Sequence, residues 1–196
     1  MRSQMVNLGS VTFPEFQHTR IYMREFYRDK PLPLDIRRWQ TTVKDLVANV
    51  DHDGPMYLMV DAAFVKAKTT HRRPGIHIDG NWVVGRWDTP HWNDPKMMGR
   101  HSHHIHNGYY AEESLILAST VKGCRAYIGD FDCEIGEGGD CSHLDVSDLK
   151  AVDLEPCNAY IGSVALLHES IPLNQDAFRT LVRINIPGYT APELRV

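Results

Sequence analysis

The sequence lacks a long hydrophobic run, a paired-cysteine motif and an excess of basic residues. No stretch approaches the ~18 apolar residues of a membrane-spanning helix, and the first thirty residues contain no apolar core of a secretion signal. The four cysteines include no C-x-x-C pair, which favours reduced thiols. With 21 basic and 25 acidic residues the net charge is −4, which does not indicate a nucleic-acid-binding surface. We therefore expect a cytoplasmic protein that neither spans a membrane nor binds nucleic acid.

The composition indicates one soluble globular domain. With 42% hydrophobic and 23% charged residues, the chain can bury a sizeable core, and 196 residues suit one domain better than two. We expect a single domain over 1–196, with an N-terminal support at about 1–55 and a core at about 56–190. Residues 34–50 carry apolar side chains at three- and four-residue steps, which predicts an amphipathic helix packed on a sheet.

The rest of the chain is predicted to be mainly β. Segments with strand-like composition alternate with short turn sequences, and Lys122-Gly123 between two of them favours a hairpin. Such strand sets close as a sandwich or a jelly roll, here with one flanking helix. The expected strands are 11–13, 21–23, 56–65, 114–121, 125–129, 160–167 and 178–186.

A histidine and an aspartate two positions apart lie between two turn signals. A Pro-Gly pair precedes them and a Gly-Asn pair follows, so that residues 76–79 fit a short strand. Alternate side chains of a strand share a face, which places His77 and Asp79 together. One imidazole and one carboxylate are two of the three ligands of the 2-His-1-carboxylate triad, which binds catalytic non-haem Fe(II). The other interpretation is a local ion pair on a surface strand.

A second histidine and two arginines follow in the C-terminal part of the chain. Residues 159–167 form an apolar run that ends at His168, and Arg179 comes after ten intervening residues. Residues 178–186 alternate like a strand, which puts Arg179 and Arg183 on one face. This order of a His-x-Asp pair, a late histidine and an arginine resembles the Fe(II)/2-oxoglutarate-dependent dioxygenases. The spacing is most similar to that of the phytanoyl-CoA-hydroxylase-like branch.

The resemblance implies a fold, a metal site and an activity. The fold would be the double-stranded β-helix, a cupin-like jelly roll with the metal between its two sheets. His77, Asp79 and His168 would bind Fe(II), and Arg179 or Arg183 would bind the distal carboxylate of 2-oxoglutarate, a role that suits a planar fork of donors. The spacing favours Arg179. The expected reaction consumes O₂, decarboxylates 2-oxoglutarate to succinate and CO₂, and hydroxylates a small polar or anionic substrate.

The resemblance also implies a substrate-covering segment directly after the His-x-Asp strand. Residues 80–108 are long and poor in aliphatic side chains, which predicts a mobile lid. The histidine-rich tract His101–His106 is interpreted as part of this lid rather than as a second metal site, because it contains no Cys or carboxylate. The candidate substrate-binding residues are Arg72, Arg73, Trp82 and Trp87.

Two other functions are compatible with the sequence. A cupin-like jelly roll, acting as a metal-binding protein or an isomerase, would keep the metal ligands without 2-oxoglutarate chemistry. An interaction module would leave His77, Asp79 and His168 far apart. Cys133 and Cys141 lie near a further histidine in the sequence, but their spacing does not match that of zinc knuckles.

Overall fold

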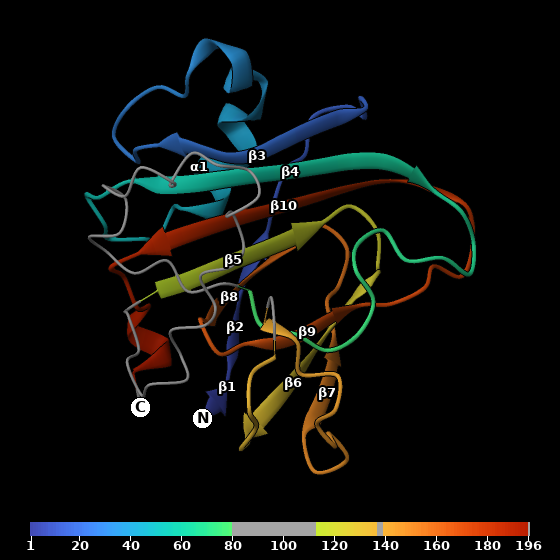
Figure 1. Ribbon diagram of the computed structural model, residues 1–196. Coiled ribbons are helices and arrows are strands. Elements are labelled where there is room, and N and C mark those ends of the chain that lie inside the picture. Colours follow the sequence, from blue (N-terminus) through green and yellow to red (C-terminus); the bar gives the residue numbers. More distant parts are fainter. Residues whose placement is uncertain (80–112, 137–138, 196) are drawn as a thin grey trace.

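The computed structural model describes residues 1–79, 113–136 and 139–195, which form two antiparallel sheets, one helical segment between the third and fourth strands and a short 3₁₀ helix near the C-terminus (Figure 1). The prediction of a mainly β chain with a flanking helix is therefore confirmed. None of the helices in these residues is long and apolar enough to cross a membrane. In chain order the elements are β1 (Arg2–Ser3), β2 (Met5–Ser10), β3 (Thr19–Phe26), the 3₁₀ helix η1 (Leu34–Trp39), α1 (Gln40–Leu46), β4 (Met56–Val65), β5 (Glu113–Ser119), β6 (Cys124–Asp130), β7 (Lys150–Asp153), β8 (Asn158–Ser163), β9 (Leu167–Ser170), β10 (Ala177–Pro187) and the 3₁₀ helix η4 (Pro192–Leu194).

The larger sheet has six strands in the order β2-β8-β5-β10-β4-β3. One of its faces packs against η1 and α1, which lie behind β3 and β4 in Figure 1. Ile116 and Ala118 of β5 belong to this core together with Trp39 and Val43 of the helical segment. Burial of these apolar side chains fixes the face of the sheet that the helices cover.

The smaller sheet packs against the opposite face of the larger one. In it β6 pairs with β1, β7 and β9. Leu115 and Leu117, which alternate with the helix-facing residues of β5, contact a cluster that contains Cys124 and Ala126 of β6. The odd-numbered residues of β4 and β10 thus face the space between the sheets, because side chains alternate along a strand.

The expected hairpin at Lys122-Gly123 is wrong. β5 and β6 do not pair: β5 lies between β8 and β10 in the larger sheet, whereas β6 belongs to the smaller sheet. The chain crosses from one sheet to the other at this turn. A short glycine-containing connection fits both a hairpin and such a crossing, and the local sequence does not distinguish them.

Two predicted element boundaries also change. The apolar run before His168 is not one strand, because a turn in which Leu166 N donates to Ser163 O separates β8 from β9. Both pieces are buried, so the hydrophobic pattern continues across the turn. The predicted helix 34–50 begins as a 3₁₀ turn and ends at Leu46, while strands 56–65 and 178–186 agree with β4 and β10. Residues 11–13 are not a strand, and 21–23 lie inside β3.

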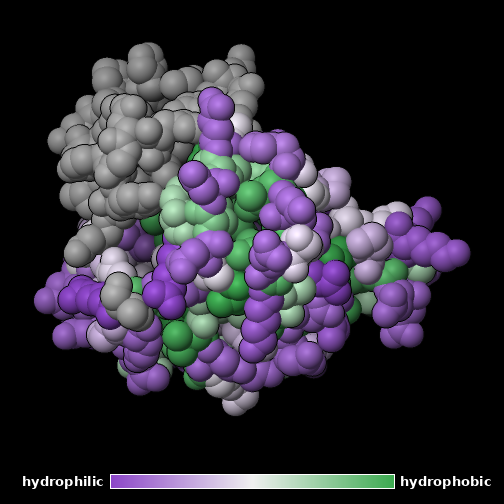
Figure 2. Space-filling model, turned by 90° about the horizontal axis from the view of Figure 1, so that it is seen from below, coloured by the Kyte–Doolittle hydropathy of each residue, from purple (hydrophilic) through white to green (hydrophobic). Residues whose placement is uncertain are grey.

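The far ends of β4 and of the segment before β10 extend away from the body of the protein. In Figure 1 the chain after β4 and the chain before β10 run side by side on the right. Backbone hydrogen bonds between Lys68 and Leu173 and between Leu173 and Thr69 join them. In the view from below, this projection carries mostly hydrophilic residues at its tip, while hydrophobic residues gather nearer the body (Figure 2).

Candidate metal centre

The segment that carries His77 and Asp79 is held on both sides by backbone hydrogen bonds. On one side His77 N donates to His168 O at 2.9 Å, and His168 N donates to His77 O at 3.0 Å. On the other side Ile78 N donates to Gly139 O at 2.9 Å, and Cys141 N donates to the carbonyl of residue 76 at 2.9 Å. The predicted strand 76–79 is thus present only as isolated bridges at His77, outside the named strands, and the four hydrogen bonds fix the segment between His168 and residues 139–141.

Both histidines are oriented by their own backbone. His77 Nδ1 lies 2.8 Å from the Gly75 carbonyl oxygen, and His168 Nδ1 lies 3.0 Å from the Leu166 carbonyl oxygen. A carbonyl accepts only, so each Nδ1 carries the proton and each Nε2 is left with a free lone pair. A backbone acceptor on the outer ring nitrogen is the usual support of a metal-binding histidine.

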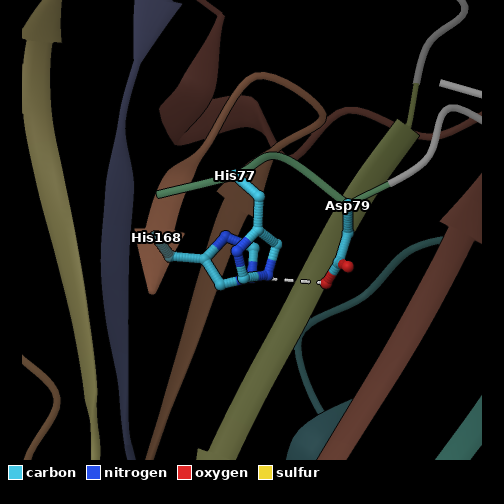
Figure 3. A group of neighbouring side chains, drawn as sticks. All are labelled: His77, Asp79 and His168. Atoms are coloured by element: carbon cyan, nitrogen blue, oxygen red, sulfur yellow. Dashed lines mark ion pairs between the residues drawn. The ribbon is translucent and has the colours of Figure 1, made fainter. Parts of the chain in front are cut away.

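The donor atoms of His77, Asp79 and His168 lie within 4.8 Å of one another. Figure 3 shows the two imidazoles packed against each other beside the Asp79 carboxylate, and their ring centroids are 4.5 Å apart. His168 Nε2 is 3.3 Å from Asp79 Oδ2. Two ligands at about 2.1 Å from one ion and at right angles would be about 3 Å apart, so this spacing suits adjacent ligands of a first-row metal.

The ionisation states also suit a divalent cation. Burial, reinforced by the neighbouring His168, lowers the pKa of His77 to about 4, so that the imidazole is neutral at pH 7. Burial opposes ionisation of Asp79, but Arg183 and His168 outweigh it and hold the pKa of this carboxyl well below its usual value. The site thus offers neutral imidazole nitrogen and one carboxylate, which is the donor set of the 2-His-1-carboxylate triad.

Arg183 holds the carboxylate of this triad. Its Nη1 is 2.7 Å from Asp79 Oδ1, and the side chains of Arg183 and Asp79 are only 12% and 18% exposed. Arg183 Nη2 lies 3.8 Å from the Met23 sulfur. Because Arg183 binds one oxygen of Asp79, the other oxygen stays turned toward His168.

Arg179 lies on the same face of β10 but has a different environment. It is 1% exposed, its Nε donates to Ser119 Oγ at 2.9 Å, and its Nη1 has no hydrogen-bond partner among the described residues. The guanidinium passes close to the Gly123 backbone, where an added Cβ would be 2.9 Å from the Arg179 Cζ. Burial lowers the pKa of Arg179, since no described carboxylate lies within ion-pair distance. A buried guanidinium of this kind is costly unless an anion accompanies it.

A second polar cluster lies on β4, on the face of the larger sheet that is turned toward the smaller sheet. Asp61 pairs with Arg72, whose Nη1 is 2.7 Å from Asp61 Oδ2. His71 Nε2 is 3.3 Å from Asp61 Oδ1, close enough for an ion pair although it is not aligned as a hydrogen bond. The contact with His71 lowers the pKa of Asp61, and Arg72 lowers it further. Burial acts in the opposite direction, and the resulting pKa is about 2. The sequence pattern alone does not single out Asp61 or His71, although one carboxylate in the apolar run 56–65 is a usable signal.

The other predicted site residues are distributed differently. Arg72 is paired with Asp61 and Arg73 is exposed, and the role of both in substrate binding stays a prediction. Trp82, Trp87, the predicted lid 80–108 and the tract His101–His106 lie outside the described residues.

The group of Cys133, Cys141 and His143, next to the His-x-Asp segment, is looser than the triad. Cys133 Sγ is 3.5 Å from His143 Nε2, and Cys141 is fully buried. Within the described part of the chain, the three donors of this group do not come as close together as those of the triad.

Comparisons with known proteins give no family. No family model and no curated protein matches this chain. Two solved structures are similar at 11% sequence identity. AviO1 from Streptomyces viridochromogenes Tue57 has a TM-score of 0.43, with 97% of this chain and 92% of that chain covered. EvdMO1 has a TM-score of 0.43, with 94% of this chain and 47% of that chain covered. Likeness at this level assigns neither a fold family nor a function.

Proposed function

We propose that this chain is a non-haem Fe(II)- and 2-oxoglutarate-dependent oxygenase with a double-stranded β-helix, or jelly-roll, fold. It hydroxylates a small polar or anionic substrate with O₂. One observation carries the proposal: a buried 2-His-1-carboxylate triad lies between two sheets that also enclose a buried arginine without an anionic partner among the described residues. The first feature suits Fe(II), and the second suits the distal carboxylate of 2-oxoglutarate.

The described residues fit the metal. His77 and His168 present Nε2, Asp79 presents Oδ2, and all three come from one end of the space between the sheets. Three protein ligands leave several positions for a 2-oxo acid and O₂. When bound, Fe(II) supplies the redox chemistry that couples decarboxylation of 2-oxoglutarate to succinate and CO₂ with hydroxylation of a C–H bond.

The residues of the chain bind and orient the reactants. Arg183 keeps Asp79 ionised and fixes which oxygen faces the metal. Arg179 offers Nη1, which has no partner in the described part of the chain, to the distal carboxylate, while Ser119 holds its Nε and orients the guanidinium. Arg179 is buried, and low water access strengthens a charge-assisted hydrogen bond between its guanidinium and the carboxylate.

The test is binding of 2-oxoglutarate to the metal-loaded protein under anaerobic conditions. We expect Fe(II) to bind first, and 2-oxoglutarate then to produce the visible charge-transfer absorption of an Fe(II)-chelated 2-oxo acid. His168→Ala removes a ligand and should abolish both signals, while the exposed His143→Ala should retain them.

Two negative outcomes have different meanings. Metal binding without 2-oxoglutarate binding would support the cupin-like metal-binding protein or isomerase instead. Absence of metal binding would exclude both functions and favour an interaction module. The same titration followed by calorimetry with an inert metal distinguishes these cases without turnover.

A further inference from the structure

Three buried side chains between the sheets have nitrogens without a hydrogen-bond partner among the described residues: Nη1 of Arg179, both ring nitrogens of His71 and Nε of Arg183. Arg183 and His71 Nε2 each lie against a carboxylate, which leaves Arg179 Nη1 and His71 Nδ1. The His71 side chain is 4% exposed, and Arg179 is 1% exposed. An unpartnered polar atom in such a place is destabilising unless a ligand satisfies it.

His71 is placed between the two sheets by the chain around it. Its neighbour Arg72 donates from its backbone N to Ser170 Oγ of β9 at 3.3 Å, in the smaller sheet. On the other side His71 Nε2 contacts Asp61 of β4, in the larger sheet. Asp61 and Arg179 share the inter-sheet face: the register aligns Asp61 with Leu181, two residues along β10 from Arg179. Asp61 therefore connects the two side chains: it contacts the His71 imidazole, and its charge acts on the Arg179 guanidinium.

Asp61 also determines which His71 nitrogen is available. The carboxylate faces Nε2, so the proton on that nitrogen points toward Asp61, and Nδ1 points elsewhere. Arg72 binds Asp61 with a contact of 2.7 Å, so that Asp61 acts on Arg179 only at longer range, and among the described residues Arg179 has no carboxylate within ion-pair distance. An incoming carboxylate would contact Arg179 Nη1 and would lie at His71 Nδ1, opposite the Asp61 carboxylate at Nε2, so that an imidazole with a proton on each nitrogen would donate to both anions.

From these positions we infer that His71 is a second binding residue for the distal carboxylate of the 2-oxo acid, donating from Nδ1 beside Arg179. This inference rests on the proposed function and deepens it. Asp61 is then a positioning residue that orients His71 and holds Arg72 away from the bound acid. Two side chains, Arg179 and His71, would then donate to the distal carboxylate. This would make the protein prefer 2-oxoglutarate to a 2-oxo acid that lacks a second carboxylate.

The experiment compares two ligands on protein loaded with an inert divalent metal. Calorimetry gives dissociation constants for 2-oxoglutarate and for 2-oxobutanoate, which keeps the chelating end and lacks the distal carboxylate. His71→Phe keeps an aromatic ring and removes both nitrogens, whereas His71→Asn keeps a donor near the Nδ1 position. His52→Phe is the matched control, because the His52 ring lies beside Tyr189 on the helix side of the larger sheet.

We expect His71→Phe to reduce the preference for 2-oxoglutarate about 10-fold or more, which is the effect of losing one charge-assisted hydrogen bond. His71→Asn should recover part of this preference, and His52→Phe should leave it unchanged. Metal affinity measured before ligand addition serves as the folding check for every variant.

Each other result has a defined meaning. Equal weakening of both 2-oxo acids by His71→Phe, or no weakening, would overturn the role of His71. If Arg179→Lys then still lowers the preference, the proposed function stands and only this inference fails. If the metal-loaded wild-type protein binds neither acid, the proposed function fails and His71 loses its assigned ligand.

Discussion

Arg183 Nη1 lies 2.7 Å from Asp79 Oδ1, so the second arginine of β10 binds a candidate metal ligand and not an open position. In the sequence both arginines occupy one face of the same expected strand, and only the spacing from His168 favours Arg179 as the carboxylate-binding residue. The structure separates them by their partners. Arg183 has a carboxylate in contact, whereas Arg179 has a serine hydroxyl and a nitrogen without a partner among the described residues.

Replacing Arg183 should therefore weaken the metal site. Arg183→Met removes the donor that orients Asp79 and the charge that keeps it ionised. We expect metal affinity to fall about 10- to 100-fold, the usual effect of losing a residue that supports a metal ligand. Calorimetric titration with Mn²⁺ or Zn²⁺ measures it. An unchanged metal affinity would mean that Asp79 is oriented without Arg183.

Replacing Arg179 should weaken binding of 2-oxoglutarate and leave metal binding unchanged. Arg179→Lys keeps one positive charge but loses the planar fork, so binding of a carboxylate falls to a single contact. We expect the dissociation constant of 2-oxoglutarate to rise about 10- to 100-fold while metal affinity stays the same. The Arg183 variant is the internal comparison, because it affects the metal first. If Arg179→Lys binds 2-oxoglutarate as tightly as wild type, Arg179 is not the anchor.

Asp61 should stabilise the fold in a pH-dependent way. Its pKa is lowered from 3.8 to about 2 in the folded protein, so its contribution is fully present above pH 3.8 and is lost as pH falls toward 2. A shift of this size corresponds to about 2 kcal/mol. We expect the difference in unfolding free energy between wild type and Asp61→Asn to be constant from pH 5 to 7 and to shrink below pH 4. Urea denaturation at several pH values measures it, and a difference that does not change with pH would contradict the ion-pair origin.

Part of the candidate site follows from local patterns in the sequence. The two-residue spacing of His77 and Asp79 on a strand is enough to bring their side chains together, and the strand period puts Arg179 and Arg183 on one face. The bounds of strand β4 agree with the predicted 56–65, because a ten-residue apolar run between turn signals permits few other structures.

The rest depends on contacts between distant segments. The local sequence pattern does not specify which sheet a strand joins. The turn at Gly123 therefore predicts a hairpin, although the chain crosses there from the larger to the smaller sheet. Residues 76–79, which carry two of the ligands, are held by hydrogen bonds to Gly139 and Cys141, and these residues lie more than sixty positions away in the sequence. The sequence does not identify His71 as a site residue, because its role depends on contact with Asp61 and on the burial of both side chains.

Gly139 provides a test of that long-range support. It has φ +83°, and a Cβ at this position would collide with the carbonyl oxygen of Ile78, the residue between the two ligands. Gly139→Ala should lower stability through the left-handed backbone, which costs about 1–2 kcal/mol, and through the collision, which adds roughly 1–3 kcal/mol. Gly9→Ala is the matched control, because Gly9 has φ +97° and no heavy atom within 4 Å of the added Cβ.

The control isolates the collision from the backbone strain. We expect both variants to melt at a lower temperature than wild type, with the larger decrease for Gly139→Ala, by about 2–4 °C for each additional kcal/mol. Only Gly139→Ala should also weaken metal binding. The atom that it displaces is the carbonyl oxygen of Ile78, which belongs to the peptide between Ile78 and the metal ligand Asp79. Differential scanning calorimetry and metal titration on the same samples measure both effects. Equal destabilisation with unchanged metal affinity would show that the contact between Gly139 and Ile78 does not hold the ligand strand in place.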